Sequence, residues 1–177
     1  MTNPKEYGRA LFLLSEEEGV TENIVADAKA VIAVFSDNPE YAKLLNTPAL
    51  AKEERLALID ESLKDVNRHV KNLVKILAEG HSAHNVGEAL LGFIDEYERA
   101  RGIEHATVIS AVPLSDGELS RLKAKLEGAT GKTFIIDAEC DPEILGGIKL
   151  RYMGKQLDSS LKTKLDRFAA SLAKTVV

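Results

Sequence analysis

The sequence contains no tryptophan, and only 5% of its 177 residues are aromatic. It has one cysteine, Cys140, so no disulfide can form within the chain, which is typical of a reducing compartment. No apolar run approaches the roughly 20 residues that a membrane-spanning helix needs, and no signal peptide is expected. These absences predict a soluble protein whose core is built from Leu, Ile, Val and Ala, as in helices packed on helices.

Charge is distributed unevenly along the chain. Residues 1–105 carry 12 Lys and Arg against 19 Asp and Glu, whereas residues 106–177 carry 11 against 9. The basic residues near the C-terminus are not interleaved with aromatic residues that could stack on bases, and the whole chain is acidic. The sequence therefore predicts no nucleic-acid partner, and the basic end is expected to be solvated or to meet an acidic protein surface.

Apolar residues in the first 105 positions recur three and four apart, and turn residues interrupt them at short intervals. Gly19 and Gly80 are expected to end the first and fifth of six predicted helices, and Thr21 or Asn23 to cap the second. The short links predict a compact six-helix bundle over residues 1–105. Its buried faces are expected to carry Tyr7, Leu11 and Leu14; Ile24, Ala28, Val31 and Phe35; Tyr41, Leu44 and Leu45; Leu56, Ile59 and Leu63; Val70, Leu73, Val74 and Leu77; and Val86, Leu90, Phe93 and Tyr97.

The periodicity changes after Gly102, which marks the predicted domain boundary. The run "HATVISAV", which Pro113 closes, and the run "KTFIID" are predicted strands, and "GIKLRYMG" alternates apolar and basic residues as a half-buried strand does. Between the first two strands a helix is predicted, with Gly128 and Gly131 past its end. A closing helix is predicted to begin at Asp158 or Ser159. The chain is thus predicted to be mainly α, with a small α+β domain over residues 106–177. The predicted helices carry Leu119, Leu122 and Leu126, and Leu161, Leu165, Phe168 and Leu172.

The pair Gly146-Gly147 raises the question of a phosphate site. A phosphate-binding loop places its glycines between a strand and a helix and continues with Lys and then Ser or Thr. Here the glycines precede a predicted strand, and no such Lys follows them. Gly146 and Gly147 are therefore predicted to make a structural turn or bulge, and Asp158 to lie at the turn before the last helix.

Other patterns give little support for catalysis. His81 and His84 lie three apart, a spacing that can hold a metal ion on a helix, but they flank a predicted helix break. The acidic run "SEEEG" has no partner acid or base at a fixed spacing, Cys140 has no neighbouring Cys or His, and no "GxSxG" motif is present. The sequence therefore predicts no catalytic residue, no metal site and no cofactor.

Four segments carry a family resemblance: "YGRALFLLSEEEG", "NLVKILAEGH", "VISAVPLS" and "DPEILGGIKLRYMGKQLDSSLKTKLDRFAASL". In this order and spacing, over nearly the whole chain, they resemble the delta subunit of bacterial F-type ATP synthase, which belongs to the oligomycin-sensitivity-conferring protein family. The chain departs from the family pattern at Ser159, where a glycine is usual, and at His81, where an arginine is common. Neither change alters the hydrophobic pattern.

The resemblance implies a non-catalytic connector of the peripheral stalk. Such a connector joins alpha subunits of the catalytic head to b subunits and resists rotor torque during proton-driven ATP synthesis. It binds no nucleotide itself and is peripheral to the cytoplasmic face of the bacterial cell membrane. The resemblance also implies that the first and fifth helices form an apolar groove for the N-terminal helix of an alpha subunit. Carried over by position, the groove residues are Tyr7, Ala10, Leu11, Leu14, Asn72 and Ile76.

Two other interpretations stay open on the residues alone: a free-standing adaptor that binds an unrelated helix, and a small enzyme of a kind that the motifs do not reveal. Recovery of synthase subunits with the protein from native membranes favours the connector. A soluble partner without synthase subunits favours the adaptor, and turnover by the purified chain favours the enzyme.

Overall fold

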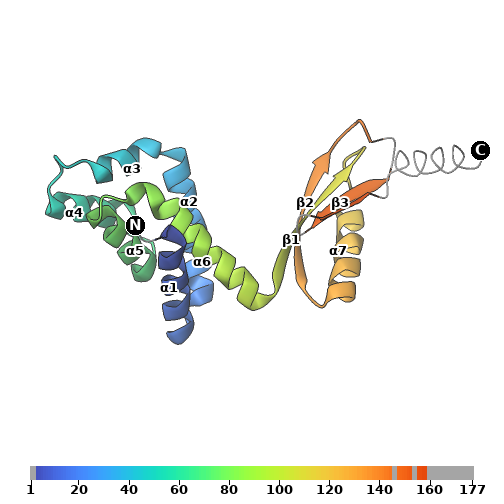
Figure 1. The fold of residues 1–177 in the computed structure, drawn as a ribbon, viewed down its shortest axis with the longest axis horizontal. Coiled ribbons are helices and arrows are strands. Elements are labelled where there is room, and N and C mark those ends of the chain that lie inside the picture. The colour runs from blue at the N-terminus through green and yellow to red at the C-terminus, as the bar shows by residue number, and fades with distance from the viewer. Residues whose placement is uncertain (1–2, 145–146, 153–154, 159–177) are drawn as a thin grey trace, which may run out of the picture. The chain divides into compact units, whose positions relative to one another are not determined.

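The computed structural model describes residues 3–144, 147–152 and 155–158, which form two compact units, Met1–Ala100 and Arg101–Val177 (Figure 1). Within these described residues there are seven α-helices and a sheet of four strands. The chain is therefore mainly helical with a small sheet, as predicted. The units divide between Ala100 and Arg101, whereas the sequence placed the boundary near residue 105.

The first unit is built from helices alone. Proline begins two of them, because its fixed φ suits the first helical position and its missing N–H has no partner there in any case. Asn3 caps α1 through its side chain, which accepts a hydrogen bond from the backbone N–H of Lys5 at 3.0 Å. The helices are α1 Pro4–Glu17, α2 Thr21–Asp37, α3 Pro39–Asn46, α4 Lys52–Ser62, α5 Arg68–Glu79 and α6 Val86–Arg101, with a 3₁₀ turn, η1, at Ala83–Asn85.

The predicted apolar faces meet in one core, to which every helix of the first unit contributes. Four of the residues assigned to these faces lie outside this core: Leu14 and Leu44, which are 40% and 45% exposed, and Leu56 and Tyr97, which are half-buried. The sequence prediction for the start of α2 is also wrong. Val20, and not Thr21, occupies the N-cap, and the Thr21 hydroxyl donates instead to the Glu16 carboxylate at 2.5 Å.

Helices α1 and α6 contact each other through their backbones. A Cβ atom built on Gly8 would lie 2.1 Å from the carbonyl oxygen of Ala89, and one on Gly92 would lie 2.9 Å from the Cα atom of Lys5. No larger residue fits at such distances. The two glycines therefore set how closely the first and last helices of this unit pack.

Arg55 is a buried cation within α4, 5% exposed. Its Nη2 donates to the carbonyls of Thr47 and Leu50 at 3.0 and 3.1 Å, and its Nη1 donates to the carbonyl of Ala78 at 3.4 Å. Buried carbonyls need such donors, because an unpaired polar group in the core is costly. Arg55 thus ties the loop between α3 and α4 to the last turn of α5.

The described part of the second unit is a mixed sheet with one helix. Its elements are β1 Ile103–Ser110, α7 Asp116–Thr130, β2 Thr133–Cys140, β3 Ile148–Tyr152 and β4 Lys155–Asp158, and the strand order is β2-β1-β3-β4. The central strand β1 pairs parallel with β2, from Ile103 opposite Thr133 to Ser110 opposite Cys140, and antiparallel with β3. The parallel pairing requires a crossover, which α7 supplies.

Helix α7 lies along one face of the sheet (Figure 1), where Leu122 and Leu126 pack against a small core of Ala106, Val108, Phe134 and Leu150. The sequence placed Gly128 past the end of this helix, which is wrong. The helix continues to Thr130, and Gly131 ends it with a φ of 68°. That conformation suits glycine, which has no Cβ to clash.

The three predicted turn residues are placed as follows. Gly147 lies directly before β3 with a φ of 85°, a conformation that a residue with a side chain rarely adopts. Asp158 ends β4, where it pairs with Lys149 of β3. Gly146 and the predicted closing helix lie outside the described residues.

Candidate functional site

A groove of about 280 Å³ runs between α1 and α5. Its α1 wall consists of Tyr7, Ala10, Leu11 and Leu14, and its α5 wall of His69, Asn72, Leu73 and Ile76. The spacing of three and four within each wall places these side chains on one face of each helix. All six residues that the sequence analysis assigned to a groove therefore lie together, and the structure adds His69 and Leu73.

The groove residues differ in how far they are buried. Leu11 and Leu73 are each 5% exposed and belong to the core, so they form the floor of the groove. Ile76 is 56% exposed and Leu14 is 40% exposed. Exposed large apolar side chains that lie beside one another form a surface of the kind that can bind a partner.

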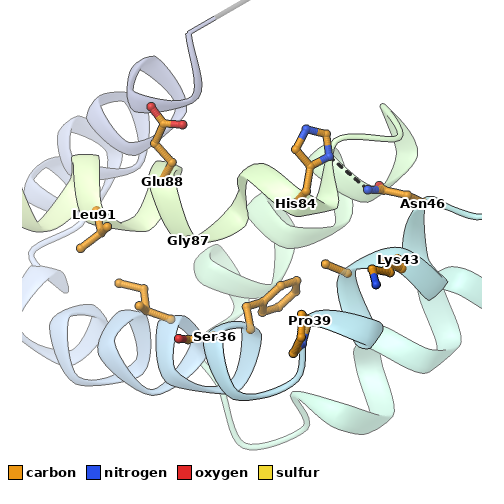
Figure 2. A pocket seen from close by; sticks show the side chains of 11 residues that line it. Ser36, Pro39, Lys43, Asn46, His84, Gly87, Glu88 and Leu91 are labelled. Atoms are coloured by element: carbon orange, nitrogen blue, oxygen red, sulfur yellow. Dashed lines mark hydrogen bonds between the residues drawn. The ribbon is translucent and has the colours of Figure 1, made fainter.

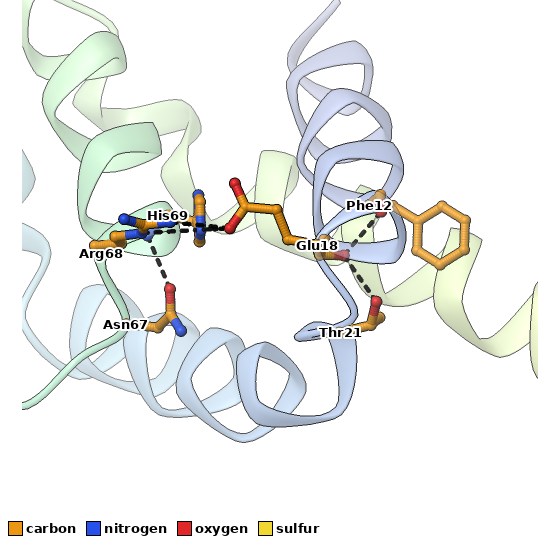
Figure 3. Close-up of polar contacts among 7 residues, drawn as sticks. Phe12, Glu18, Thr21, Asn67, Arg68 and His69 are labelled. Carbon is orange, nitrogen blue, oxygen red and sulfur yellow. Dashed lines mark hydrogen bonds and ion pairs between the residues drawn. The ribbon is translucent and has the colours of Figure 1, made fainter.

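One end of the groove is polar (Figure 3). Glu18, the C-cap residue of α1, accepts hydrogen bonds from Arg68 Nη2 at 2.9 Å and from His69 Nε2 at 3.0 Å. A carboxylate only accepts, so the proton of the His69 ring lies on Nε2, and the nearby Nε of Arg68 is then a contact without a hydrogen bond. Since the end of α1 meets the start of α5, the two helices run antiparallel along the groove.

The Arg68 hydrogen bond lowers the pKa of the Glu18 carboxyl below its ordinary value, with His69 as a smaller contribution in the same direction and desolvation opposing both. We expect Arg68→Ala to raise the pKa of Glu18, because the main hydrogen bond to the carboxylate is lost. Titration of the side-chain carboxyl carbon by NMR measures this directly.

The sign of the linked stability follows from the lowered pKa. Glu18 stabilises the folded protein above the unfolded-state pKa of about 4.3, and this contribution is lost as the pH falls through the lower pKa of the folded protein. The wild-type chain and the Arg68→Ala variant should therefore differ in stability near neutral pH and converge in acid. Equal Glu18 pKa values in the two proteins would show that Arg68 does not hold this carboxylate in solution.

A larger hollow, of about 560 Å³, lies between α2, α3 and the start of α6 (Figure 2). Ile32, Phe35 and Leu91 give it an apolar lining, and Lys43 and Glu88 contribute opposite charges. The sequence analysis did not single out this surface. Size alone does not make it the site, and unlike the α1–α5 groove it contains none of the residues that the family resemblance assigned to partner binding.

The two histidines weighed as metal ligands both contact Asn46. The Asn46 side-chain amide donates to His84 Nδ1 at 3.1 Å, and His81 Nδ1 lies 3.3 Å from the Asn46 carbonyl oxygen. His81 has a φ of 52° and lies in the break after α5, whereas His84 lies in η1, so the two residues do not share a helix. Among the described residues, no group of three or more His, Cys, Asp or Glu is placed to hold a metal ion.

Comparison with protein families gives a match over nearly the whole chain. The model of the family described as ATP synthase delta (OSCP) subunit matches residues 4–172. The chain is similar to the ATP synthase subunit delta of Geobacillus sp. (strain WCH70), with 33% identity covering 95% of both chains. It is also similar to that of Brevibacillus brevis, with 32% identity covering 93% of this chain and 95% of the relative, and to that of Rhodospirillum rubrum, with 28% identity covering 95% and 91%.

A solved structure shares the fold. A chain in the Toxoplasma gondii mitochondrial ATP synthase hexamer matches with a TM-score of 0.66 and 20% identity, covering 98% of each chain. In the part of the chain that the structure describes, no helix combines the length and the apolar character needed to cross a bilayer.

Proposed function

The chain belongs to the ATP synthase delta (OSCP) subunit family, and we propose that its α1–α5 groove binds the N-terminal helix of an alpha subunit. As a family member it is a non-catalytic connector of the synthase stator, a structural subunit of a larger membrane-associated enzyme. In this proposal the chain has no catalytic site of its own and lies peripherally on the cytoplasmic face of the bacterial cell membrane.

The observation that carries the proposal is the joint placement of the groove residues. Two antiparallel helices present an apolar floor between them, and exposed apolar side chains such as Ile76 form the rim. An amphipathic helix buries its apolar stripe in a groove of this kind. Ala10 has a small side chain on the α1 wall, so the backbone of a bound helix can approach that wall closely. In this role α1 to α6 act together as a six-helix bundle that holds the catalytic head.

The second unit is proposed to meet the b subunits of the peripheral stalk. Its sequence is more basic than that of the first unit, which suits an acidic partner surface. The proposal thus divides the work between the two units: the first holds the head, and the second attaches it to the stalk. The boundary between these roles falls near residues 101–105.

Reconstitution of stripped membranes with the catalytic head tests the connector role. The full chain should restore attachment of the head, measured as ATPase activity that sediments with the membranes. Gly147→Val should weaken attachment several-fold, because valine is strained at a φ of 85°, while binding of an alpha-subunit N-terminal peptide stays unchanged.

Gly128→Val is the matched control for this experiment, since a Cβ atom there meets no other atom within 4 Å. It should behave as the wild type in both measurements. Loss of peptide binding by Gly147→Val with attachment intact would contradict the proposed division of roles. Failure of the wild-type chain to restore attachment would contradict the connector role itself.

A further inference from the structure

Asn72 places a polar side chain at the middle of the α5 wall of the groove, between His69 and Ile76. The side chain is exposed in the free protein, where water can bond to it. In the part of the chain that the structure describes, its amide group makes no hydrogen bond to another residue. A bound helix covers this amide, so Asn72 then needs a partner that the chain itself does not supply.

The other polar side chains next to it on this face of α5 are already paired within the chain. Arg68 and Lys75 lie four positions before and three positions after the asparagine, on the same side of the helix. Arg68 and His69 both bind the Glu18 carboxylate, at 2.9 and 3.0 Å. Lys75 binds the Asp60 carboxylate at 2.6 Å. These cations are therefore engaged, and the asparagine is available to a partner.

The α1 wall does not supply the missing partner. Ala10 holds the middle of that wall, and Leu11 and Leu14 are apolar as well. In the described structure the Tyr7 hydroxyl, at the start of this wall, makes no hydrogen bond to Asn72. The eight residues that line the groove include no Asp or Glu, so a lysine or arginine of the partner would be buried without an opposite charge. The groove therefore suits a partner residue that is polar but neutral.

The backbone of a bound helix satisfies only half of the Asn72 amide, which has both donors and an acceptor. A carbonyl oxygen of the helix can accept a second hydrogen bond, so it can take one from the NH2 group of Asn72. Beyond the first turn, however, the N–H groups of a helix are already used within it. The side-chain oxygen of Asn72 therefore needs a donor on a side chain of the partner.

We propose, building on the function proposed above, that Asn72 determines which helix the groove accepts. The groove selects an amphipathic helix that carries Gln, Asn, Ser or Thr beside its apolar stripe, where the stripe crosses the middle of the α5 wall. A helix with only apolar side chains at that level leaves the Asn72 oxygen unpaired after water is displaced, which weakens binding. A single polar pair in an apolar contact also fixes the register of two helices.

The test uses the full chain and the N-terminal peptide of the alpha subunit. Calorimetry measures the binding of the native peptide and of variants in which each Gln, Asn, Ser and Thr is replaced by Leu in turn. For one of these residues, the replacement should weaken binding to the wild-type chain about tenfold, because Asn72 loses its partner. Asn72→Leu should weaken binding of the native peptide by a similar factor, because the peptide residue is then unpaired.

Rescue distinguishes a hydrogen bond from a general loss of fit. The same peptide variant should bind Asn72→Leu within about threefold of the native affinity, because apolar groups then replace both partners. Asn23→Leu is the matched control, since Asn23 is also exposed on a helix, α2, and does not line the groove. It should leave binding of every peptide unchanged. Leucine favours a helix more than asparagine does, so both variants should stay folded, which circular dichroism checks.

The side-chain NH2 signals of Asn72, identified by their absence from the NMR spectrum of Asn72→Leu, provide a second measurement. The native peptide should slow their exchange with water and leave that of Asn23 unchanged. Unchanged exchange at Asn72, or the absence of any peptide residue whose replacement Asn72→Leu rescues, would overturn this inference alone. No binding of the native peptide to the wild-type chain, or binding that Ile76→Asp leaves intact, would overturn the proposed function and this inference together.

Discussion

Replacing Ile76 with aspartate is expected to lower the affinity of the chain for the N-terminal helix of an alpha subunit by at least a hundredfold. The side chain is 56% exposed in the free protein, so the carboxylate is solvated and the fold is kept. Docking of a helix then buries an unpaired charge, at a cost of several kcal/mol. Calorimetry with the alpha-subunit peptide measures the loss, and circular dichroism confirms that the variant is folded.

The choice of control variant makes this result decisive. Leu11→Asp is unsuitable as a test, because Leu11 is 5% exposed and aspartate there should unfold the first unit. Leu91→Asp is the informative control, since Leu91 is 49% exposed and lines the hollow between α2, α3 and α6. Peptide binding that survives Ile76→Asp and is lost in Leu91→Asp would place the partner helix in that hollow.

Gly8→Ala is expected to destabilise the first unit by about 3 kcal/mol, at the upper end of the range for overpacked cores. The new methyl group would lie 2.1 Å from the Ala89 carbonyl oxygen and 2.5 Å from the Phe93 nitrogen, so α1 must move away from α6. Both neighbours are backbone atoms, which cannot swing aside as a side chain does. Thermal unfolding followed by circular dichroism should show a midpoint lower by about 10 °C or more.

Gly87→Ala tests whether the effect comes from crowding. Gly87 also lies in a helix of the first unit, α6, but a Cβ atom there meets nothing within 4 Å. Alanine has the higher helix propensity, so this variant should gain about 0.5 to 1 kcal/mol. A Gly8→Ala protein as stable as the wild type would show that α1 and α6 are not held as closely as described.

Local periodicity was enough to predict the helices of the first unit. Val70, Leu73, Val74 and Leu77 lie on one face and are all buried. The same periodicity could not show that Leu44 stays exposed, because a repeat of three and four marks a face and does not say what that face meets. Arg55 was not predicted as a core residue either. Its burial depends on the carbonyls of Thr47 and Leu50 and on that of Ala78, which lies far from both in the chain.

Six groove residues were predicted by resemblance, and the local pattern could have added the two that the resemblance did not name. His69 precedes Asn72 by three positions and Leu73 precedes Ile76 by three, so extending the same helical face would have found both. In the second unit, the strand pattern of "KTFIID" stopped short of Cys140, because the polar residues at its end do not alternate. Parallel pairing with β1 extends that strand, and pairing is not visible in the sequence of one strand.

The central position of β1 determines how the second unit resists being pulled. A pull along the strand direction can enter β1 at its first residue, Ile103, which directly follows Gly102. Because β1 is bonded over all eight of its residues to β2 on one side and over five of them to β3 on the other, such a pull shears both ladders at once. Bonds loaded in shear must break together, whereas bonds at the end of a peeled strand break one after another. In the proposed connector role, a load passed on from the first unit would therefore meet a strand that is paired on both sides.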